Sequence, residues 1–422
     1  MVCCGGAASE YGSQQSWAFY APLRNGESVP AAFKPQTAIV GIGATEFSKN
    51  SGRSELRLAL EAVTAALADA AIDPLEVDGL VSFSMDPSDE VAVARNLGVR
   101  DLTYFVRTPG GGGGACGTVA LASLGIATGM ANVVVCYRAM NERSGHRFGQ
   151  PGAAAAPPQR NPPSRDIDRS WNVPFGMVTA ASMTAPVARR YMHQYGATSE
   201  DFGLVSVNAR NFAATNPAAW FYEKPITLDD HQNSRMIADP LRLLDCCQES
   251  DGAVALVVTS LERAKDLPQP PVAILASAQG SGPNSFTVAQ PYRENLARAV
   301  DVEVIAKQLW AQSGLKPQDM DLANCYDHFT PAVLMQLEGL GFCGLGEAAG
   351  FIRDEGIGLD GRLPVNTNGG QIGEAYIHGF NGIAEVVRQL RGTAVNQVPN
   401  ARHAAVISGI HAVDSGLILG RD

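Results

Sequence analysis

From Thr37 onward, runs of apolar residues alternate with stretches of mixed polarity. The first apolar run, TAIVGIGATEF, suits a buried strand. The stretch after it, LRLALEAVTAALADA, repeats Ala and Leu at three- and four-residue spacing, as one face of a helix does. Further strand-like runs follow at GLVSFSM, TYFV, NVVVCYR and GAVALVV. Helical stretches separate the earlier of these strands, so the order predicts an α/β fold.

A second series of elements follows the linker DLPQPP. Its predicted strands are PVAILASA, LANCYD, LPVNT, AAVISG and GLILG. Its predicted helices are LARAVDVEVIAKQLW, PAVLMQLEGLGF and GEAYIHGFNGIAEVVRQL. The second series repeats the first in element order rather than in residues. This repetition predicts a structural duplication, with one half at 37–265 and the other at 266–422.

Two segments lie outside this duplicated pattern. Residues 141–250 interrupt the first half and open with a Pro-, Ala- and Gly-rich stretch. A structureless loop of that length is rare in a compact domain, so we expect a lid or binding subdomain with its own helices, including MTAPVARRYMHQYG. Residues 1–36 are small, polar and aperiodic, and are predicted to form a flexible N-terminal extension outside the core.

Composition narrows the function classes. A chain of 422 residues, 45% hydrophobic, exceeds the size of one hydrophobic core. The formal charge of −10 argues against a nucleic-acid surface. The eight cysteines form no C-x-x-C pair and no His cluster has zinc spacing, so no metal site is expected. No apolar stretch reaches the roughly 20 residues of a membrane span, and no signal peptide is evident, so we expect a cytoplasmic protein.

Two glycine-rich turns stand at equivalent places in the two halves, GGGGGACG at 110–117 and NTNGGQIGEAY at 366–376. Each is predicted to enter a helix, whose free N–H groups and partial positive charge could face an anion or oxyanion. The glycines could also serve only to permit tight turns. Neither turn matches a dinucleotide fingerprint or a phosphate loop.

Long motifs carry a family resemblance. The stretch SRMIADPLRLLDCCQESDGAVALVV resembles the D-P-L-x-x-L-x-C-C-x-x-S-D-G-A segment of sterol-carrier-type thiolases. The stretch NTNGGQIGEAYIHGFNG resembles their N-P-x-G-G-x-x-x-x-G-H-P-x-G active-site turn. The resemblance runs from about residue 37 to 422 and implies the duplicated five-layered thiolase fold, α-β-α-β-α.

The cysteines of thiolase chemistry are absent. Alignment with the family helix puts the nucleophile position at Gly112. Cys116 lies four residues later, within the helix, and is predicted to be a small core residue. Thiolases also use a second cysteine near the C-terminus, but no cysteine follows Cys343. Chemistry through an acyl-enzyme is therefore not expected.

Two tyrosines occupy positions that the family gives to oxyanion donors. Tyr376 stands at the histidine of the G-H-P turn, and Tyr326, in CYDHFT, stands at the histidine or asparagine of the second motif. A phenol can donate a hydrogen bond to a thioester oxygen and can also exchange a proton. The alternative is that both are aromatic residues that fill the space of a lost site.

This pair of tyrosines resembles that of the lipid-transfer-protein-type steroid aldolases of the superfamily. The resemblance implies retro-aldol cleavage of a β-hydroxyacyl-CoA steroid side chain, giving a 17-ketosteroid and propionyl-CoA without a cysteine nucleophile. It assigns Tyr326 to the substrate hydroxyl and Tyr376 to protonation of the enolate. The alternatives are a non-catalytic scaffold that binds acyl-CoA or lipid, and another thiolase-fold acyltransferase.

Several neighbours are candidate supporting residues. Asp327 and His328 adjoin Tyr326, and on a strand only His328 would share the face of Tyr326. His378 would face away from Tyr376 if both lay on one helix. Two further candidates occupy the loop where thiolases keep the base cysteine, namely His411 and Asp414. The candidate oxyanion or substrate turns consist of Gly112, Gly113, Gly369 and Gly370.

The resemblance implies coenzyme A as part of the substrate and no covalently bound cofactor. Six arginines between Arg138 and Arg169, against three acids, could meet the phosphates of coenzyme A or could form an ordinary solvated loop. The resemblance also implies a homodimer and a partner with an OB fold and a zinc ribbon, or a hydratase-linked domain. Zinc is expected only in that partner.

Overall fold

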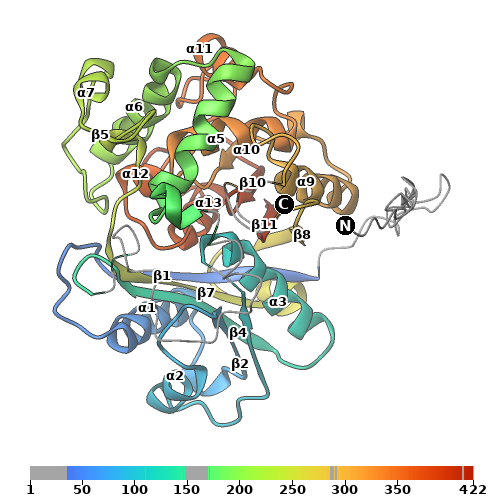
Figure 1. Cartoon of the computed structure of the whole chain (residues 1–422). Helices are drawn as coiled ribbons and strands as arrows, with labels where there is room; N and C mark the ends of the chain where they lie inside the picture. Colours follow the sequence, from blue (N-terminus) through green and yellow to red (C-terminus); the bar gives the residue numbers. More distant parts are fainter. Residues whose placement is uncertain are drawn as a thin grey trace, which may run out of the picture.

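The computed structural model describes residues 36–109, 111–145, 147, 170, 172–285, 289, 292–410 and 413–421. Its main feature is a mixed sheet of nine strands in the order β3-β2-β4-β7-β1-β8-β11-β10-β9 (Figure 1). The strands are β1 (Thr37–Ala44), β2 (Gly79–Phe83), β3 (Tyr104–Thr108), β4 (Val133–Asn141), β7 (Asp251–Ser260), β8 (Val272–Gly280), β9 (Leu322–Asn324), β10 (His403–Ile407) and β11 (Asp414–Gly420). The predicted extension at 1–36 lies outside the described residues, apart from Gln36.

The pairing of the strands shows the duplication. In the first half β7 pairs antiparallel with β1 and β4, and β2 pairs parallel with β4 and β3. In the second half β11 pairs antiparallel with β8 and β10, and β9 pairs parallel with β10. A parallel bridge from Ala323 to Val365 takes the place of β3. The halves meet where β1 pairs with β8.

Helices cover both outer faces of the sheet and separate its two halves. They are α1 (Glu55–Ala70), α2 (Glu90–Leu97), α3 (Ala115–Ala127), α8 (Leu261–Ala264), α9 (Val300–Ser313), α10 (Thr330–Leu340), α11 (Ala348–Asp354), α12 (Gly370–Gly373) and α13 (Phe380–Arg391). Helices α3 and α13 each contact strands of both halves, whereas α1 packs on the first half and α9 on the second. This arrangement gives the five layers that the resemblance implies.

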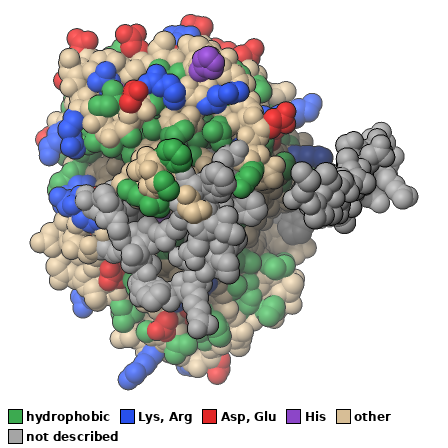
Figure 2. Space-filling model, in the orientation of Figure 1, with side chains coloured by type: hydrophobic (Ala, Val, Ile, Leu, Met, Phe, Trp, Pro, Cys, Tyr) green, Lys and Arg blue, Asp and Glu red, His purple; other side chains and the backbone are tan. Residues whose placement is uncertain are grey.

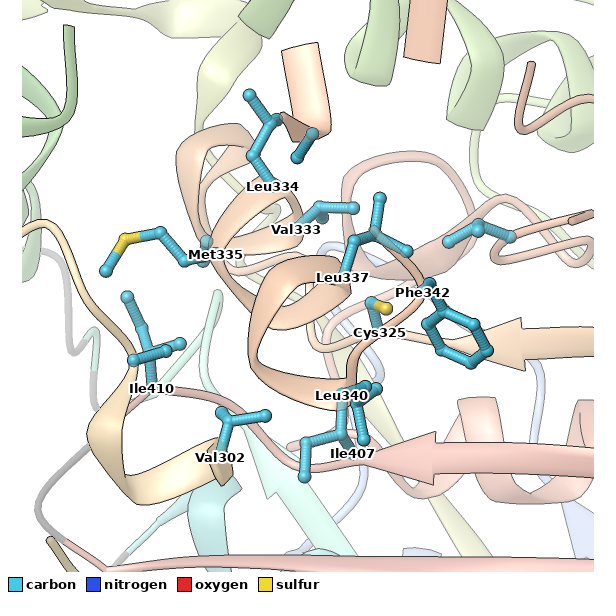
Figure 3. Packing of buried hydrophobic residues seen from close by; sticks show 14 of the residues in the cluster. Val302, Cys325, Val333, Leu334, Met335, Leu337, Leu340, Phe342, Ile407 and Ile410 are labelled. Atoms are coloured by element: carbon cyan, nitrogen blue, oxygen red, sulfur yellow. The ribbon is translucent and has the colours of Figure 1, made fainter. Parts of the chain in front are cut away.

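Three hydrophobic clusters correspond to the three helical layers. Alternate residues of β4 show how the sheet divides them, because Val134 and Cys136 join the central cluster while Val133 and Val135 join the cluster of α1. The third cluster surrounds α10, and Figure 3 shows Cys325 inside it, next to Leu337 and Phe342. Since side chains alternate along an extended chain, the next residue, Tyr326, points away from this cluster.

The interrupting segment contains helices, as expected, and it packs on the other half of the molecule. Its elements are α5 (Ala180–Tyr195), α6 (Ser199–Thr215), α7 (Leu228–Asn233), β5 (Met236–Ala238) and β6 (Leu241–Arg242). Helix α6 contacts α10, α11 and α12, all of the second half, and Figure 1 shows this group above β1 and β7. The Pro-, Ala- and Gly-rich stretch at its start lies outside the described residues.

Two predicted elements differ from the structure. The helix expected from Gly373 begins only at Phe380, because His378 (φ 49°) and Gly379 (φ 84°) adopt left-handed backbone conformations that no α-helix contains. The strand expected at LPVNT is reduced to the single bridge at Val365. The late start of α13 leaves residues 374–379 in an irregular turn.

The charges on the surface and the lengths of the helices indicate whether the protein suits a nucleic acid or a membrane. On the face shown in Figure 2 acidic and basic side chains are interspersed, so this face does not offer the continuous basic surface that nucleic acids bind. None of the helices in the described ranges is long and apolar enough to cross a membrane.

Candidate active site

The two tyrosines singled out in the sequence lie in direct contact. Tyr326 follows β9 and Tyr376 lies in the turn after α12. The Tyr326 hydroxyl donates to the Tyr376 hydroxyl at 3.0 Å, and the rings meet edge to face with centroids 6.3 Å apart. Tyr326 is buried, and Tyr376 is partly exposed. The fold therefore brings the two phenols together from positions 50 residues apart.

Gly112 lies against the same pair. A Cβ atom at Gly112 would stand 1.8 Å from the Tyr326 Oη and 2.0 Å from its Cζ. Gly379 also packs against the ring, since its Cβ would lie 3.1 Å from Tyr326 Cδ2. The phenol of Tyr326 thus fills the space that a side chain at position 112 would need. Through Tyr326, Gly112 and Tyr376 belong to one site, although 264 residues separate them in the sequence.

Burial keeps both phenols protonated. It raises the pKa of Tyr326 and of Tyr376 well above the ordinary value of 10.0. For Tyr326 the hydrogen bond to Tyr376 works in the opposite direction but is the smaller effect. Near neutral pH the pair is therefore a pair of proton donors rather than a phenolate base.

His328 and Asp327 lie on opposite sides of the chain, as predicted. The His328 ring stacks beside Tyr326, with centroids 5.1 Å apart. The Asp327 carboxylate instead accepts the backbone N–H groups of Gln371 (2.8 Å) and Ile372 (3.3 Å). Burial raises the pKa of Asp327 to about 6, against the effect of these two bonds. Asp327 thus fixes the turn that carries Tyr376.

In the second glycine turn, the N–H groups of Gly369 and Gly370 form hydrogen bonds within the turn. The Gly369 N–H donates to Asn366 O at 2.8 Å, and the Gly370 N–H donates to Asn368 Oδ1 at 3.1 Å. A Cβ at Gly370 would stand 2.0 Å from Asp327 Oδ2. Both N–H groups therefore donate within the turn itself, which contributes to its conformation.

The first glycine turn packs against the start of β11. The Ser415 hydroxyl donates to Gly113 O at 2.6 Å and accepts the Gly117 N–H at 2.8 Å. Asp414 is buried, and its Oδ1 lies 2.8 Å from where a Gly113 Cβ would be. Asp414 therefore adjoins the site, whereas His411 lies outside the described residues.

A cavity of about 510 Å³, called here the tyrosine cavity, opens beside the pair. Tyr376 and His328 form part of its wall, and Tyr326 lies next to that wall through its bond to Tyr376. Its cationic residues are Lys49, Arg143, Arg147 and Arg210. Its larger apolar residues are Phe221, Ile237, Leu243, Leu244, Phe329 and Ile372. A volume of this order suits a small-molecule site.

Comparisons with known proteins show the family of this chain. Residues 287–421 match a family model described as "Thiolase C-terminal domain-like". The chain is 59% identical to a 17-hydroxy-3-oxo-4-pregnene-20-carboxyl-CoA lyase of Mycobacterium tuberculosis, over 91% of this chain and 99% of the relative. It is 58% identical to a steroid side-chain-cleaving aldolase of Thermomonospora curvata, over 91% of this chain and 98% of the relative. The chain belongs to the steroid side-chain-cleaving aldolases of the thiolase superfamily.

A solved structure of such an aldolase also matches. It is described as "Ltp2-ChsH2(DUF35) aldolase" and superposes with a TM-score of 0.87 at 55% identity, over 93% of this chain and 99% of that chain. The match confirms the thiolase-like fold that the motifs predict.

The cysteines near the aldolase site are protonated thiols. Cys116 is fully buried, and burial raises its pKa to about 12. Cys246 and Cys247 belong to the wall of the tyrosine cavity, and burial raises the pKa of both, to about 12 for Cys246. A thiol with so high a pKa is a poor nucleophile.

We therefore expect that Cys116→Ala retains most of the lyase activity and that iodoacetamide does not abolish it. Lyase rates before and after alkylation, with the fold checked by thermal melting, measure this. Stoichiometric radiolabelling of one cysteine by the acyl-CoA substrate would contradict it.

His378 and Arg138 correct two expectations. His378 lies beside Tyr376 rather than facing away, with ring centroids 5.2 Å apart, because residues 374–379 form a turn and not a helix. The Arg138 Nε donates to His378 Nδ1 at 3.0 Å, and its Nη1 pairs with Asp86 at 2.9 Å. Arg138 is buried in this ion pair, so it does not belong to the basic residues available to coenzyme A.

Several residues of the aldolase cavity escaped the sequence analysis. They are Lys49, Glu142 and Arg210, which lie outside the motifs, and Cys247. Glu142 follows the end of β4, which in an α/β sheet is a frequent position for functional residues. Cys247 stands within the family motif D-P-L-x-x-L-x-C-C, which offered a signal for it.

Proposed function

We propose that this aldolase cleaves a β-hydroxyacyl-CoA steroid side chain by a retro-aldol reaction, giving a 17-ketosteroid and propionyl-CoA. The observation that carries this proposal is the phenol pair at 3.0 Å beside a glycine at the nucleophile position. A retro-aldol reaction needs proton transfer and stabilisation of an enolate but no covalent intermediate. The relative named as a 20-carboxyl-CoA lyase supports the choice of substrate class.

Tyr326 is assigned to the substrate hydroxyl and Tyr376 to protonation of the propionyl-CoA enolate. As the O–H bond of the tertiary alcohol breaks, its electron pair forms the ketone, and the C–C bond breaks toward the thioester. The phenols stabilise the enolate oxygen by hydrogen bonds until the α-carbon takes a proton. His328 and Asp414, next to the pair, are proposed as supporting residues. Gly112 and Gly113 supply the space that the reacting groups need.

The cationic residues of the tyrosine cavity are proposed to bind the phosphates of coenzyme A. Arg143 and Arg147 have half-exposed side chains, and both approach Glu249, at 4.0 Å and 2.6 Å. Arginine recognises phosphate well because its guanidinium offers several fixed donors. The apolar residues on the same wall suit a hydrocarbon ring system.

A homodimer and an OB-fold partner are also proposed. In the described sheet β3 is an edge strand that pairs only with β2. It carries Phe105, which is 59% exposed, in the first half, which also has exposed Leu124 and Met130. An exposed edge with apolar side chains suits association with a second copy. The solved aldolase named with ChsH2(DUF35) supports a complex with a protein of that kind.

A lyase assay of the purified protein, alone and with its partner, tests the function. We expect release of the ketosteroid and propionyl-CoA in equal amounts, without added cofactor. Tight binding of the acyl-CoA without turnover in either preparation would favour the non-catalytic scaffold. Transfer of the acyl group to a second thioester would favour an acyltransferase.

A further inference from the structure

Two neutral phenols leave the proposed reaction without a proton acceptor. The substrate hydroxyl must lose a proton before the C–C bond breaks, but Tyr326 and Tyr376 both hold their own protons near neutral pH. A neutral phenol can accept a proton only if it passes its own to another group. The bond from Tyr326 to Tyr376 shows the first step of such a transfer, so an acceptor is required beyond Tyr376.

Glu142 is an ionisable group of the cavity wall that the assignments above do not use. Only 4% of the residue is exposed, and it contributes to the same cavity as Tyr376. Its Oε2 atom is buried and has no hydrogen-bond partner in the part of the chain that the structure describes. Buried carboxyl oxygens are normally hydrogen-bonded, so an exception suggests a role in function.

The backbone N–H groups of Glu142 and Tyr376 both donate hydrogen bonds to Ser250. The Glu142 N–H donates to Ser250 O at 3.3 Å, as a continuation of the pairing of β4 with β7. The Tyr376 N–H donates to Ser250 Oγ at 3.1 Å. The sheet and the turn after α12 therefore place the carboxyl group and the phenol against one anchor.

We propose that Glu142 is the acceptor that ends a proton relay from the substrate hydroxyl through Tyr326 and Tyr376. It acts through Tyr376, by a hydrogen bond or one bridging water, and so positions and holds the proton rather than touching the substrate. This inference rests on the retro-aldol function proposed above.

The relay balances over one turnover. The alcohol proton moves to Tyr326, the Tyr326 proton to Tyr376, and the Tyr376 proton to the Glu142 carboxylate. The C–C bond then breaks toward the thioester, and Tyr376 gives its proton to the α-carbon of the enolate. The Glu142 carboxyl finally returns a proton to the Tyr376 phenolate. No external acid, base or oxidant is consumed.

Glu142 has both negatively and positively charged groups around it. The carboxylate of Glu249 raises the pKa of Glu142, and the cations Arg138 and Lys49 lower it. The other ionisable groups of the neighbouring cavity wall and tyrosine pair are Arg143, Arg147, Arg210, Cys246, Cys247, Tyr326, His328 and Tyr376. Burial is the largest effect, and the pKa of Glu142 lies well above the ordinary 4.5. A carboxyl group of this kind can take up and release a proton nearer to neutral pH.

The test is the replacement Glu142→Gln, which keeps the size of the side chain and removes proton exchange. We expect kcat to fall about 10- to 100-fold, below the full range of a direct acid or base because the residue acts through Tyr376. The KM for the acyl-CoA should change less than about threefold. In the wild type, kcat/KM should rise with pH as Glu142 loses its proton, around its raised pKa. In the variant, kcat/KM should not show this rise.

Stability separates this role from a structural one. Because the folded state holds the Glu142 proton after the unfolded chain has lost it, this residue lowers the stability as pH rises from 4.5 through the raised pKa. The variant lacks this loss, so its melting temperature at pH 8 should equal or exceed that of the wild type, and the difference should shrink toward pH 5. A merely structural residue would give a lower melting temperature at pH 8.

Two further variants complete the experiment. Glu142→Asp keeps a carboxylate, so its kcat/KM should still rise with pH. Its kcat should lie between those of the wild type and Glu142→Gln. Glu338→Gln removes another buried carboxyl group, which accepts a hydrogen bond from Tyr191 outside the cavity. This variant should keep the rise of kcat/KM with pH, and its kcat should stay within about threefold of the wild type. An active wild type with an equally active Glu142→Gln would overturn this inference alone. A wild type without lyase activity, with and without partner, would overturn the proposed function as well.

Discussion

Tyr326→Phe and Tyr376→Phe are each expected to slow steroid side-chain cleavage by at least about 100-fold while the fold remains intact. Each change removes one positioned proton donor, a loss that typically costs 10²- to 10⁴-fold in rate. Each ring stays, so the packing of residue 326 against Gly112 and His328 and that of residue 376 against His378 are preserved. The measurement is kcat/KM with a β-hydroxyacyl-CoA steroid, together with a thermal melt.

Tyr137→Phe is the matched control. The Tyr137 hydroxyl is also buried and donates to Ser88 O at 2.9 Å, but it lies in the cluster of α1. Its loss should change turnover less than about threefold, because Tyr137 is not part of the tyrosine cavity and its hydrogen bond contributes only about 1 kcal/mol, to stability. If the two site tyrosines behaved like Tyr137, the pair would only fill space, and the catalysis would belong to other residues.

Gly112→Ala is expected to reduce kcat by about 100- to 1000-fold. The new Cβ would lie 1.8 Å from the Tyr326 Oη, well inside van der Waals contact, so the phenol must move. A displacement of about 1 Å in a reacting group can cost about 100-fold in rate. Rates measured beside a structure of the variant would show whether the hydroxyl pair still forms at 3.0 Å.

Gly350→Ala provides the comparison. Gly350 lies in α11, and a Cβ there meets nothing closer than Asp354 Oδ2 at 3.9 Å. This variant should keep full activity and gain a little stability, since alanine favours a helix over glycine. Full activity of Gly112→Ala would show that the close contact between Gly112 and Tyr326 has no part in the reaction.

The order of elements was readable from the sequence because it depends on local periodicity. The strands of the first half were found for this reason, and β8, β9, β10 and β11 follow one another along the chain in the order predicted for the second series. The helix start at Phe380 was missed because left-handed conformations at His378 and Gly379 depend on local packing. That error carried over to His378, whose predicted direction assumed a continuous helix.

The tyrosine pair was predictable because long motifs contain both residues. Glu142, Lys49 and Arg210 were not, since each lies in a different segment and only the assembled sheet and the α6 region bring them to one cavity. Burial was equally invisible in the sequence. Arg138, counted as a basic residue for coenzyme A, proved to be enclosed in an ion pair with Asp86.

The contact between Gly112 and Tyr326 also constrains how one activity could evolve into the other. A cysteine at position 112 and the present tyrosine at position 326 need the same volume, so neither thiolase-like nor aldolase-like chemistry tolerates a hybrid of the two. A mutational path from one to the other must therefore pass through a small residue at one of these positions. An intermediate on the path through position 112 would have a glycine there before the phenol arrived. A cysteine introduced at position 112 alone would clash with the phenol of Tyr326. Restoring a nucleophile there would first require a smaller residue at position 326.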